Sequence, residues 1–375
     1  HTTANEFFEL LASEGERGIE EVVKARKEAG AGEEEEGGEE GREEGKEMAE
    51  AMEGQLKTPE EWGRMAWAGA RVEFMRNQAK LVGGHAFPRA SLGSRHTLVP
   101  TISYSPSTTK KILSTCKAHN STISHAVFAL CNLAFIRCTE KEKRDERLPC
   151  MIYSALNLRP FLRTEGDWYK IAIGYYNIIL PTFLPATRTP TETFWYRALL
   201  TRQQTSAVVK SKFMASRSKL MALERERRSI GFEREDERRR VERENKKGLA
   251  GLGISMDALK VGEKKAPVEV KVEVEKKEEK KEEKKIAVPS IALMGVSMLG
   301  NLDGMYKAKD YPSIQLHTLT TGSRQRPGAL LLFAYTFAGK LWLSLGYDSH
   351  GFQAGVIEKF WTALQGGIDE FLIAE

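Results

Sequence analysis

The stretch that decides the fold, residues 328–347, reads GALLLFAYTFAGKLWLSLGY. Two runs of apolar and aromatic residues flank the short turn Ala338-Gly339, a pattern typical of two strands joined in a β-hairpin. Two earlier runs, IALMGVSML at 291–299 and SIQLHTLTT at 313–321, have a similar strand-like character. Together the four runs predict a β-meander in the C-terminal part of the chain.

Helical patterns surround this sheet-forming block. The chain closes with a helix predicted at 352–373, because its apolar residues recur at three- and four-residue steps. Those residues are Val356, Phe360, Leu364, Ile368 and Phe371. Further helices are predicted at 58–80, 106–117, 121–137 and 191–214, and further strands at 96–105, 150–161 and 171–183. The last of these strands is nearly apolar throughout, as in a sheet covered on both faces. The order of the elements indicates a mixed α/β fold.

Charge is distributed unevenly along the chain, although the net charge is only +5. Residues 1–54 hold 18 Glu and no Asp against six Lys or Arg, and residues 202–285 hold 25 basic and 17 acidic side chains. Stretches so rich in charge cannot bury a hydrophobic core. We therefore predict four parts. The first is an N-terminal helix with a Glu-rich linker at 1–57, and the second is an α/β part at 58–215. A charged insertion at 216–285, part helix and part disordered, is the third, and the C-terminal strands with a closing helix at 286–375 are the fourth.

Several classes of protein are excluded by what the sequence lacks. It has no Walker loop, no GxGxxG after a strand, no HExxH and no GxSxG. The apolar runs fall short of the ~20 residues needed to cross a bilayer, so we expect no membrane span. Basic residues of the insertion are interleaved with Glu, so we expect no nucleic-acid partner. The cysteines form no CxxC pair, which favours a reducing, cytoplasmic location and core packing over a metal site. They are Cys116, Cys131, Cys138 and Cys150.

Four blocks of sequence in combination carry a resemblance to a known family. They are STISHAVFALCNLAF at 121–135, YSALNLRPF at 153–161, SMLGNLDGMY at 297–306 and TTGSRQRPGALLLFAYTFAGKLWLSLGYD at 320–348. These blocks resemble fungal acyltransferases of the chloramphenicol-acetyltransferase and condensation-domain superfamily, in particular its trichothecene 15-O-acetyltransferase-like and alcohol O-acetyltransferase-like members. The resemblance implies a two-layer mixed-sheet sandwich of the CoA-dependent acyltransferase type, here N-terminally truncated and carrying the charged insertion.

The superfamily is organised around an HxxxD motif, whose His acts as a general base and whose Asp holds the loop in place. The positional match in this sequence is HTTAN, which puts the base at His1 and a neutral Asn5 in the place of Asp. Two interpretations stay open. Either His1 is the base, or the sequence begins at an arbitrary point and the true motif lies upstream. The resemblance further implies that Ser297 is a candidate donor to the oxyanion, the alternative being a hydroxyl bonded to neighbouring backbone.

The remaining candidate residues follow from the same resemblance. Polar residues suited to holding a cofactor phosphate or pantetheine amides are Ser121, Thr122, Ser124, Thr321, Ser323, Arg324 and Gln325. Residues with an expected structural role, in bracing a loop or forming a turn, are Arg159, Asn301, Asp303 and Gly304. Plain polar loops, a helical structural histidine at 125 and a surface salt bridge of Arg159 are the alternatives. No metal site is expected.

Three functional hypotheses result. The first is a CoA-dependent O-acyltransferase, with acyl-CoA as co-substrate rather than a tightly bound cofactor, and with a small alcohol of fungal secondary metabolism as acceptor. The second is a non-catalytic acyltransferase-fold binding protein or a truncated fragment. The third is a condensation-type domain that forms amides on a carrier protein. The sequence makes no prediction of oligomeric state.

Overall fold

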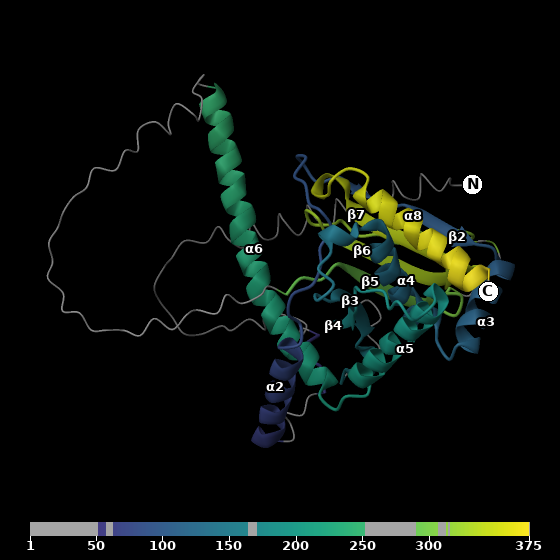
Figure 1. The fold of residues 1–375 in the computed structure, drawn as a ribbon. Coiled ribbons are helices and arrows are strands. Elements are labelled where there is room, and N and C mark those ends of the chain that lie inside the picture. The colour runs from purple at the N-terminus through teal and green to yellow at the C-terminus, as the bar shows by residue number, and fades with distance from the viewer. Residues whose placement is uncertain are drawn as a thin grey trace. The chain divides into compact units, whose positions relative to one another are not determined.

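A mixed β-sheet is the centre of the part of the chain that the computed structural model describes (Figure 1). The described residues are 52–57, 63–163, 171–251, 290–306, 313 and 316–374. They belong to one compact unit, Glu50–Glu375. The predicted base at His1, its companion Asn5, the Glu-rich linker and the second half of the charged insertion lie outside the described residues. The division into four parts therefore stays a prediction.

The sheet of this unit contains seven strands. They are β1 Thr97–Leu98, β2 Thr101–Tyr104, β3 Cys150–Asn157, β4 Ile173–Leu180, β5 Met294–Asn301, β6 Leu330–Phe337 and β7 Lys340–Asp348. Their order is β1-β7-β6-β5-β3-β4, and β2 also pairs with β7. Strand β5 is parallel to both of its neighbours, β3 and β6, and the other pairs are antiparallel.

The hairpin of β6 and β7 is confirmed, but the wider meander is wrong. Phe337 pairs with Lys340 across the predicted turn at Ala338-Gly339. Because β5 runs parallel to β6, the chain between them crosses from one end of the sheet to the other. Within 313–321, the described residues 316–321 form no strand. Leu319 instead packs on β6 with its carbonyl accepting a hydrogen bond from the Tyr335 hydroxyl.

The strand predicted at 96–105 is divided in two. Val99 and Pro100 separate β1 from β2, and both short strands pair with β7. Proline has no backbone N–H to donate to a ladder, so the pairing is interrupted there. The carbonyl of Pro100 still accepts a hydrogen bond of 2.9 Å from the Leu345 N–H. The interruption therefore redirects the strand without detaching it from the sheet.

The helices agree closely with the sequence patterns. They are α2 Arg64–Gln78, α3 Pro106–Ala118, α4 Ile123–Cys138, α5 Pro190–Val209, α6 Met214–Gly251 and α8 Val356–Ile368, with a π-helical turn at Asp369–Ile373 and 3-10 turns at Lys141–Lys143, Arg159–Phe161 and Ser349–Gly351. Phe360, Leu364, Ile368 and Phe371 are all buried, which confirms the amphipathic closing helix. The helix predicted at 191–214 ends earlier, because α5 stops at Val209 and Met214 begins α6. Its start is capped by Thr189, whose hydroxyl accepts from the Glu192 N–H, and Pro190 follows the cap.

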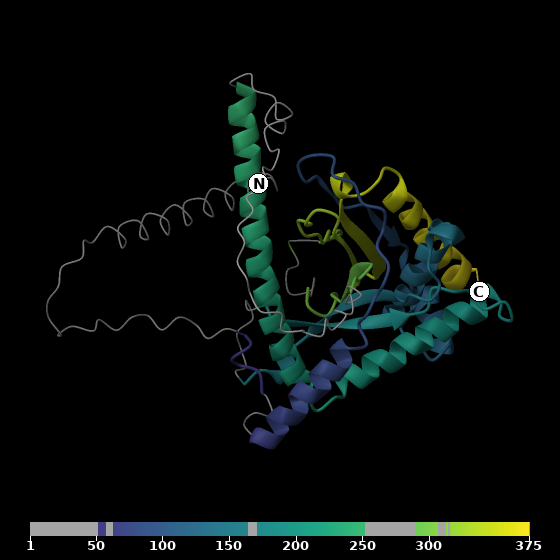
Figure 2. The same ribbon diagram turned by 60° about the vertical axis from the view of Figure 1, so that its left-hand side comes forward.

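Helices α3, α4, α5 and α8 and the main core lie on one face of the sheet (Figure 2). Leu330, Leu332 and Ala334 of β6 point into this core, and α4 is buried along its whole middle. Because side chains alternate along a strand, Tyr335 and Phe337 lie on the opposite face. They form a second, smaller cluster there with Leu302 and Trp342. The two faces thus have separate apolar clusters, of which the helix-covered one is larger.

Strand β4 differs from the expectation of a strand covered on both faces. It is an edge strand of the described sheet, and Ile173 at its start is 38% exposed. Its free edge is closed in part by a side chain of α5, since Oε1 of Gln204 accepts from the Ile179 N–H at 2.9 Å and Nε2 donates to the Ile179 carbonyl at 2.8 Å. The Gln204 carboxamide therefore takes the place of a neighbouring strand at one residue.

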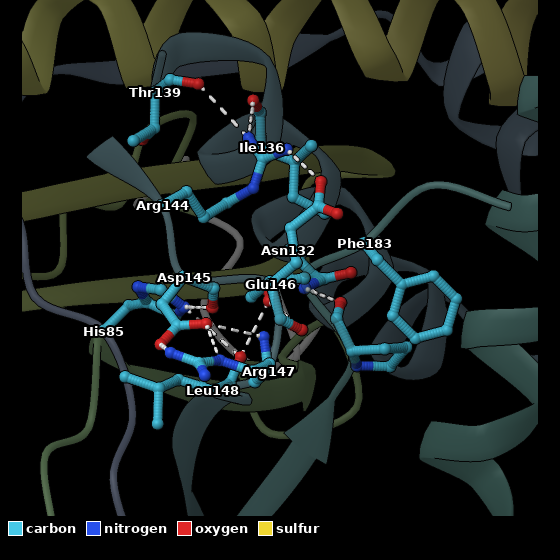
Figure 3. Close-up of polar contacts among 12 residues, drawn as sticks. His85, Asn132, Ile136, Thr139, Arg144, Asp145, Glu146, Arg147, Leu148 and Phe183 are labelled. Atoms are coloured by element: carbon cyan, nitrogen blue, oxygen red, sulfur yellow. Dashed lines mark hydrogen bonds and ion pairs between the residues drawn. The ribbon is translucent and has the colours of Figure 1, made fainter. Parts of the chain in front are cut away.

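A polar network beneath the helices fixes the start of β3 (Figure 3). Nη1 of Arg144 donates to the carbonyls of Ile136 and Thr139 at 3.0 and 3.2 Å, which satisfies acceptors at the end of α4. Nearby, Nε2 of His85 lies 3.1 Å from the Asp145 carbonyl and 3.2 Å from the Leu148 carbonyl. These contacts hold the connection from α4 to β3 against the core.

None of the described helices is by itself long and apolar enough to cross a membrane, and α3 and α4, which reach that limit only together, are bent by 91°.

The cysteines lie in or beside the core, and Cys116, Cys131 and Cys150 are buried. Burial raises the pKa of Cys116 and Cys150 to about 12, so both thiols are protonated and unreactive at neutral pH. Within the described ranges no group of three or more His, Cys, Asp or Glu side chains is placed to hold a metal ion.

Candidate functional site

Ser297 lies on the face of the sheet opposite the helices. Met294 and Val296 of β5 point into the main core, so the alternation puts Ser297 on the other face, where it is half-buried. The register of the sheet sets its neighbours. Ser297 pairs with Phe333 on one side, and the pairing of Ser154 with Val296 puts Ala155 on the other. The small Ala155 leaves the serine hydroxyl open to its surroundings.

Two tyrosines extend this face towards the edge of the sheet. The ring of Tyr153 lies across Gly295, where an added Cβ would be 2.2 Å from the ring, so only glycine allows this position. Tyr153 contacts Tyr175 edge-on at 6.1 Å between ring centroids. The guanidinium of Arg225 on α6 lies 3.5 Å from the Tyr175 ring centroid, a cation–π contact. Burial, and then the neighbouring Tyr175, raise the pKa of Tyr153, so its hydroxyl keeps its proton and can donate a hydrogen bond.

A cavity of about 220 Å³ opens beside the edge strand β4. Its walls come from α2, β4, α5 and α6, with the apolar and carboxamide side chains Phe74, Asn77, Gln78, Leu81, Tyr175, Tyr176, Asn177, Ile179, Gln204, Ala207, Val208 and Met221 and the cations Lys80 and Arg217. Arg217 is paired with Glu73 of α2, and no carboxylate lines the cavity among the described residues. A mostly apolar wall with carboxamides and phenol groups suits an uncharged molecule that carries hydroxyl or carbonyl groups.

The cavity and Ser297 are linked through Tyr175. This side chain lines the cavity, and in the sheet Tyr175 pairs with Ala155, which neighbours Ser297. Adjacent strands lie ~4.8 Å apart, so Ser297 is about 10 Å from the cavity wall. The Arg225 guanidinium covers the Tyr175 ring between them, so the side chain of α6 lies at the boundary between the cavity and Ser297.

The polar stretch at 321–325 lies on the same face as Ser297. Nε2 of Gln325 donates to Oγ of Ser323 at 2.7 Å, and an added Cβ at Gly346 would meet this Gln325 nitrogen at 3.4 Å, which places the stretch over β7. The Gln325 N–H donates to the Thr97 hydroxyl. The Thr321 hydroxyl is buried without a hydrogen-bond partner among the described residues, so it is an atom that a bound ligand would satisfy. Arg324 is exposed.

The second predicted cofactor group, at the start of α4, lies in the helical layer instead. There Nδ1 of His125 accepts from the Thr122 N–H at 3.3 Å and lies 3.5 Å from the Ser121 hydroxyl. Ser124 belongs to the first turn of the same helix. The structure therefore does not bring this group together with residues 321–325, because the sheet separates them. Its polar atoms serve the N-terminus of α4.

The residues predicted to be structural take part in turns. Oδ1 of Asp303 accepts from the Ala338 N–H at 2.6 Å, and Oδ2 accepts from the Gly339 N–H at 3.1 Å. Oδ1 of Asn301 accepts from the Asp303 N–H at 3.0 Å, and Gly304 follows in the same turn. Arg159 is exposed at the end of β3, where its N–H donates to the Asn157 side chain. None of these groups lies in the row of paired residues across the sheet that contains Ala155, Ser297 and Phe333.

Several residues of this site were not predicted from the sequence. Tyr153 and Tyr175 carry only the pattern of strand residues, and Arg225 lies in a charge-dense helix whose contacts no local pattern reveals. The one available signal was Gly295 inside an apolar strand, since a strand glycine often marks a close approach of another group. The cavity walls come from segments that are far apart in sequence, so their meeting required the fold.

Comparison with known proteins identifies the fold. No family model and no curated protein matches the sequence. Among solved structures, the trichothecene 15-O-acetyltransferase TRI3 from Fusarium sporotrichioides is 9% identical, with a TM-score of 0.55 over 86% of this chain and 56% of that chain. The epimerization domain of tyrocidine synthetase B is 14% identical, with a TM-score of 0.44 over 80% of this chain and 56% of that one. The PapA2 acyl transferase is 10% identical, with a TM-score of 0.40 over 81% and 51%.

The chain spans little more than half the length of these structures. At such low identity the likeness to the acetyltransferase shows the fold and leaves substrate and partners undetermined. Its sheet mixes parallel and antiparallel strands, with a helical layer on one face. The chain therefore shares its mixed α/β fold with this acetyltransferase structure, the fold that the resemblance in its sequence implies.

Proposed function

We propose that the protein is a CoA-dependent O-acyltransferase that transfers an acetyl group to an uncharged, hydroxylated and largely apolar small molecule. The observation that carries the proposal is the half-buried Ser297 on the face of the sheet opposite the main core, two strands from the edge strand β4, whose residues line an apolar cavity. The fold shared with an acetyltransferase that acts on a trichothecene supports this reaction class and an acceptor from fungal secondary metabolism.

In this proposal the acceptor occupies the cavity, with its apolar body between Phe74 and Val208 and its polar groups on the carboxamides of Asn77 and Asn177. The absence of carboxylates from the described wall disfavours a cationic acceptor, because no group there compensates a buried cation. The acyl-CoA lies along 321–325, where the Thr321 and Ser323 hydroxyls and the Gln325 amide are suited to pantetheine amides and Arg324 to a phosphate.

The chemical step requires a base, for which we propose His1, with the neutral Asn5 at the position of the family's Asp. The imidazole accepts the proton of the acceptor hydroxyl, and the oxygen forms a bond to the thioester carbonyl carbon. The carbonyl oxygen becomes an oxyanion, to which the Ser297 hydroxyl donates a hydrogen bond. The intermediate then collapses, the carbon–sulfur bond breaks, and the imidazolium returns its proton to the leaving coenzyme A thiolate.

The test is release of free thiol from acetyl-CoA by the full chain, with a panel of apolar alcohols and matched amines. The proposal predicts release that depends on an alcohol and is lost in His1→Ala. Release with amines alone, or only from an acyl group on a carrier protein, would assign a condensation-type reaction instead. No release, together with no thermal stabilisation by coenzyme A, would identify a non-catalytic protein of this fold.

A further inference from the structure

Helix α2 has two different faces. The inner face packs beside the start of α6, as Figures 1 and 2 both show, with Ala70 buried and Phe74 in the cavity wall. Glu73, the only acidic residue of α2, is on this inner side and pairs with Arg217 of α6. The inner face is therefore packed against the fold, whereas the other described residues leave the outer face exposed.

The outer face presents a narrow apolar stripe. Its members follow a 3-4-3-4 spacing and are all exposed: Met65, Ala68, Val72, Met75 and Ala79. Met65 is 87% exposed, Val72 50% and Met75 56%. This spacing puts the side chains on one line along the helix, the a and d positions of a heptad. An apolar line this narrow matches the seam between two packed helices.

The charges beside the stripe all have one sign. Arg64 and Arg71 flank it on one side and Arg76 flanks it on the other, and all three are exposed. In a helix pair, charges that flank the seam select the partner, because opposite charges attract and like charges repel across it. A basic seam therefore selects a partner helix with acidic flanks.

We propose that the outer face of α2 is a docking site for an acidic amphipathic helix of another polypeptide. A second copy of α2 fits poorly, because its arginines would face those of the first. A membrane surface also fits poorly, because helices that lie in the bilayer interface bury a wide apolar face with Trp, Phe or Leu, and the stripe contains only Met, Val and Ala. The proposal does not depend on acyl transfer.

The probes are two synthetic helical peptides with Leu at heptad positions a and d. The acidic peptide carries Glu at positions e and g, and the basic peptide carries Lys there. Binding to the full chain is measured by fluorescence anisotropy at low and high salt. We expect the acidic peptide to bind about tenfold more tightly than the basic one, with the preference reduced at high salt. The double variant Val72→Glu/Met75→Glu should lose the binding, and Arg71→Glu/Arg76→Glu should reverse the preference.

Ile230→Glu on α6 is the matched control, since Ile230 is 45% exposed and lies away from the stripe. It should bind the acidic peptide as the unmodified chain does. Equal affinity for the two peptides, no binding of either, or binding that survives Val72→Glu/Met75→Glu would overturn the proposal. Self-association of the chain, or binding to anionic phosphatidylserine vesicles, that disappears in the stripe variant would assign the face to a second copy or to a membrane and would also overturn it.

Discussion

Nη1 of Arg197 donates a hydrogen bond of 2.5 Å to Oδ1 of Asn132 within the core, and both side chains are fully buried. Nη2 of Arg197 donates to the Phe183 carbonyl at 2.6 Å. No carboxylate pairs with this guanidinium among the described residues, and burial lowers its pKa to about 10. It is still a cation at neutral pH, held by neutral acceptors that join α4, α5 and the end of β4.

Replacing Arg197 should lower the stability of the folded chain. Arg197→Met removes the donors and leaves Asn132 and the Phe183 carbonyl unsatisfied, so we expect the free energy of unfolding to fall by about 3 kcal/mol. Urea denaturation followed by circular dichroism measures it. Arg202→Met is the matched control on the same helix, since Arg202 is exposed and donates to the Asn120 carbonyl, and it should cost less than ~1 kcal/mol. Equal losses in the two variants would contradict a special role for Arg197.

The cavity beside β4 should be required for acceptor binding. Ala207→Phe adds a ring at the cavity wall, so we expect the KM for the alcohol to rise about tenfold or more, with no change in the affinity for coenzyme A. Steady-state kinetics and calorimetry separate the two effects. Val209→Phe, at an exposed position outside the cavity, should leave both values unchanged. A changed affinity for coenzyme A in Ala207→Phe would place the cofactor in this cavity.

The Asp303 carboxylate should stabilise the β6–β7 hairpin. Ala338 has φ +52° and Gly339 φ +68°, so alanine is strained in this turn. The Asp303 carboxylate accepts hydrogen bonds from the N–H groups of both residues. Asp303→Ala should lower the free energy of unfolding by about 1 kcal/mol, and adding Ala338→Gly should recover part of it. Differential scanning calorimetry reads both. A loss of acyl transfer at unchanged stability would instead make Asp303 a catalytic acid.

The sequence predicted the elements better than their arrangement. The three- and four-residue spacing of the closing helix and the hairpin at Ala338-Gly339 could be predicted because local sequence patterns determine them. The parallel pairing of β5 with β6 was not, because it depends on which strands become neighbours after a long connection. Residues 313–321 have strand composition, yet Leu319 packs on the sheet instead of joining it, which is a tertiary preference that no local pattern contains.

In the candidate site too, single residues could be predicted from the sequence, but their arrangement in space could not. Ser297 was found through a resemblance, and the structure places it beside Phe333 and Ala155 on a partly open face. The polar residues at 121–124 were expected near a coenzyme through the resemblance, and those at 321–325 because a polar stretch between two strands suits a cofactor phosphate or pantetheine amides. Composition carries no information about the side of a sheet, and the sheet separates them.

The start of α4 should respond to pH. Burial, and then the nearby Arg202, lower the pKa of His125 below its ordinary value of 6.5, and its unprotonated Nδ1 accepts from the Thr122 N–H. The unfolded chain therefore binds the proton more readily, so this contribution to stability is complete above pH 6.5 and is lost as the pH falls through the folded pKa.

The matched variants for this pH effect are His125→Gln and His125→Ala. Gln can accept from the same N–H but does not titrate, so its free energy of unfolding should depend less on pH below 6.5 than that of the unmodified chain. Ala should be less stable at all pH values, by about 1 kcal/mol. Unfolding in urea at several pH values tests this. An identical pH dependence for the unmodified chain and His125→Gln would show that His125 does not titrate in this window.

Acetyl transfer from acetyl-labelled acetyl-CoA to an apolar alcohol, compared between the full chain and Ser297→Ala, tests the central claim most directly. The account predicts labelled ester with the unmodified chain and a kcat about 100-fold lower in Ser297→Ala, at unchanged affinity for coenzyme A. Ser103→Ala, at an exposed serine of β2, should retain full activity. Labelled ester formed equally well by Ser297→Ala, or no ester from the unmodified chain with any alcohol, would contradict it.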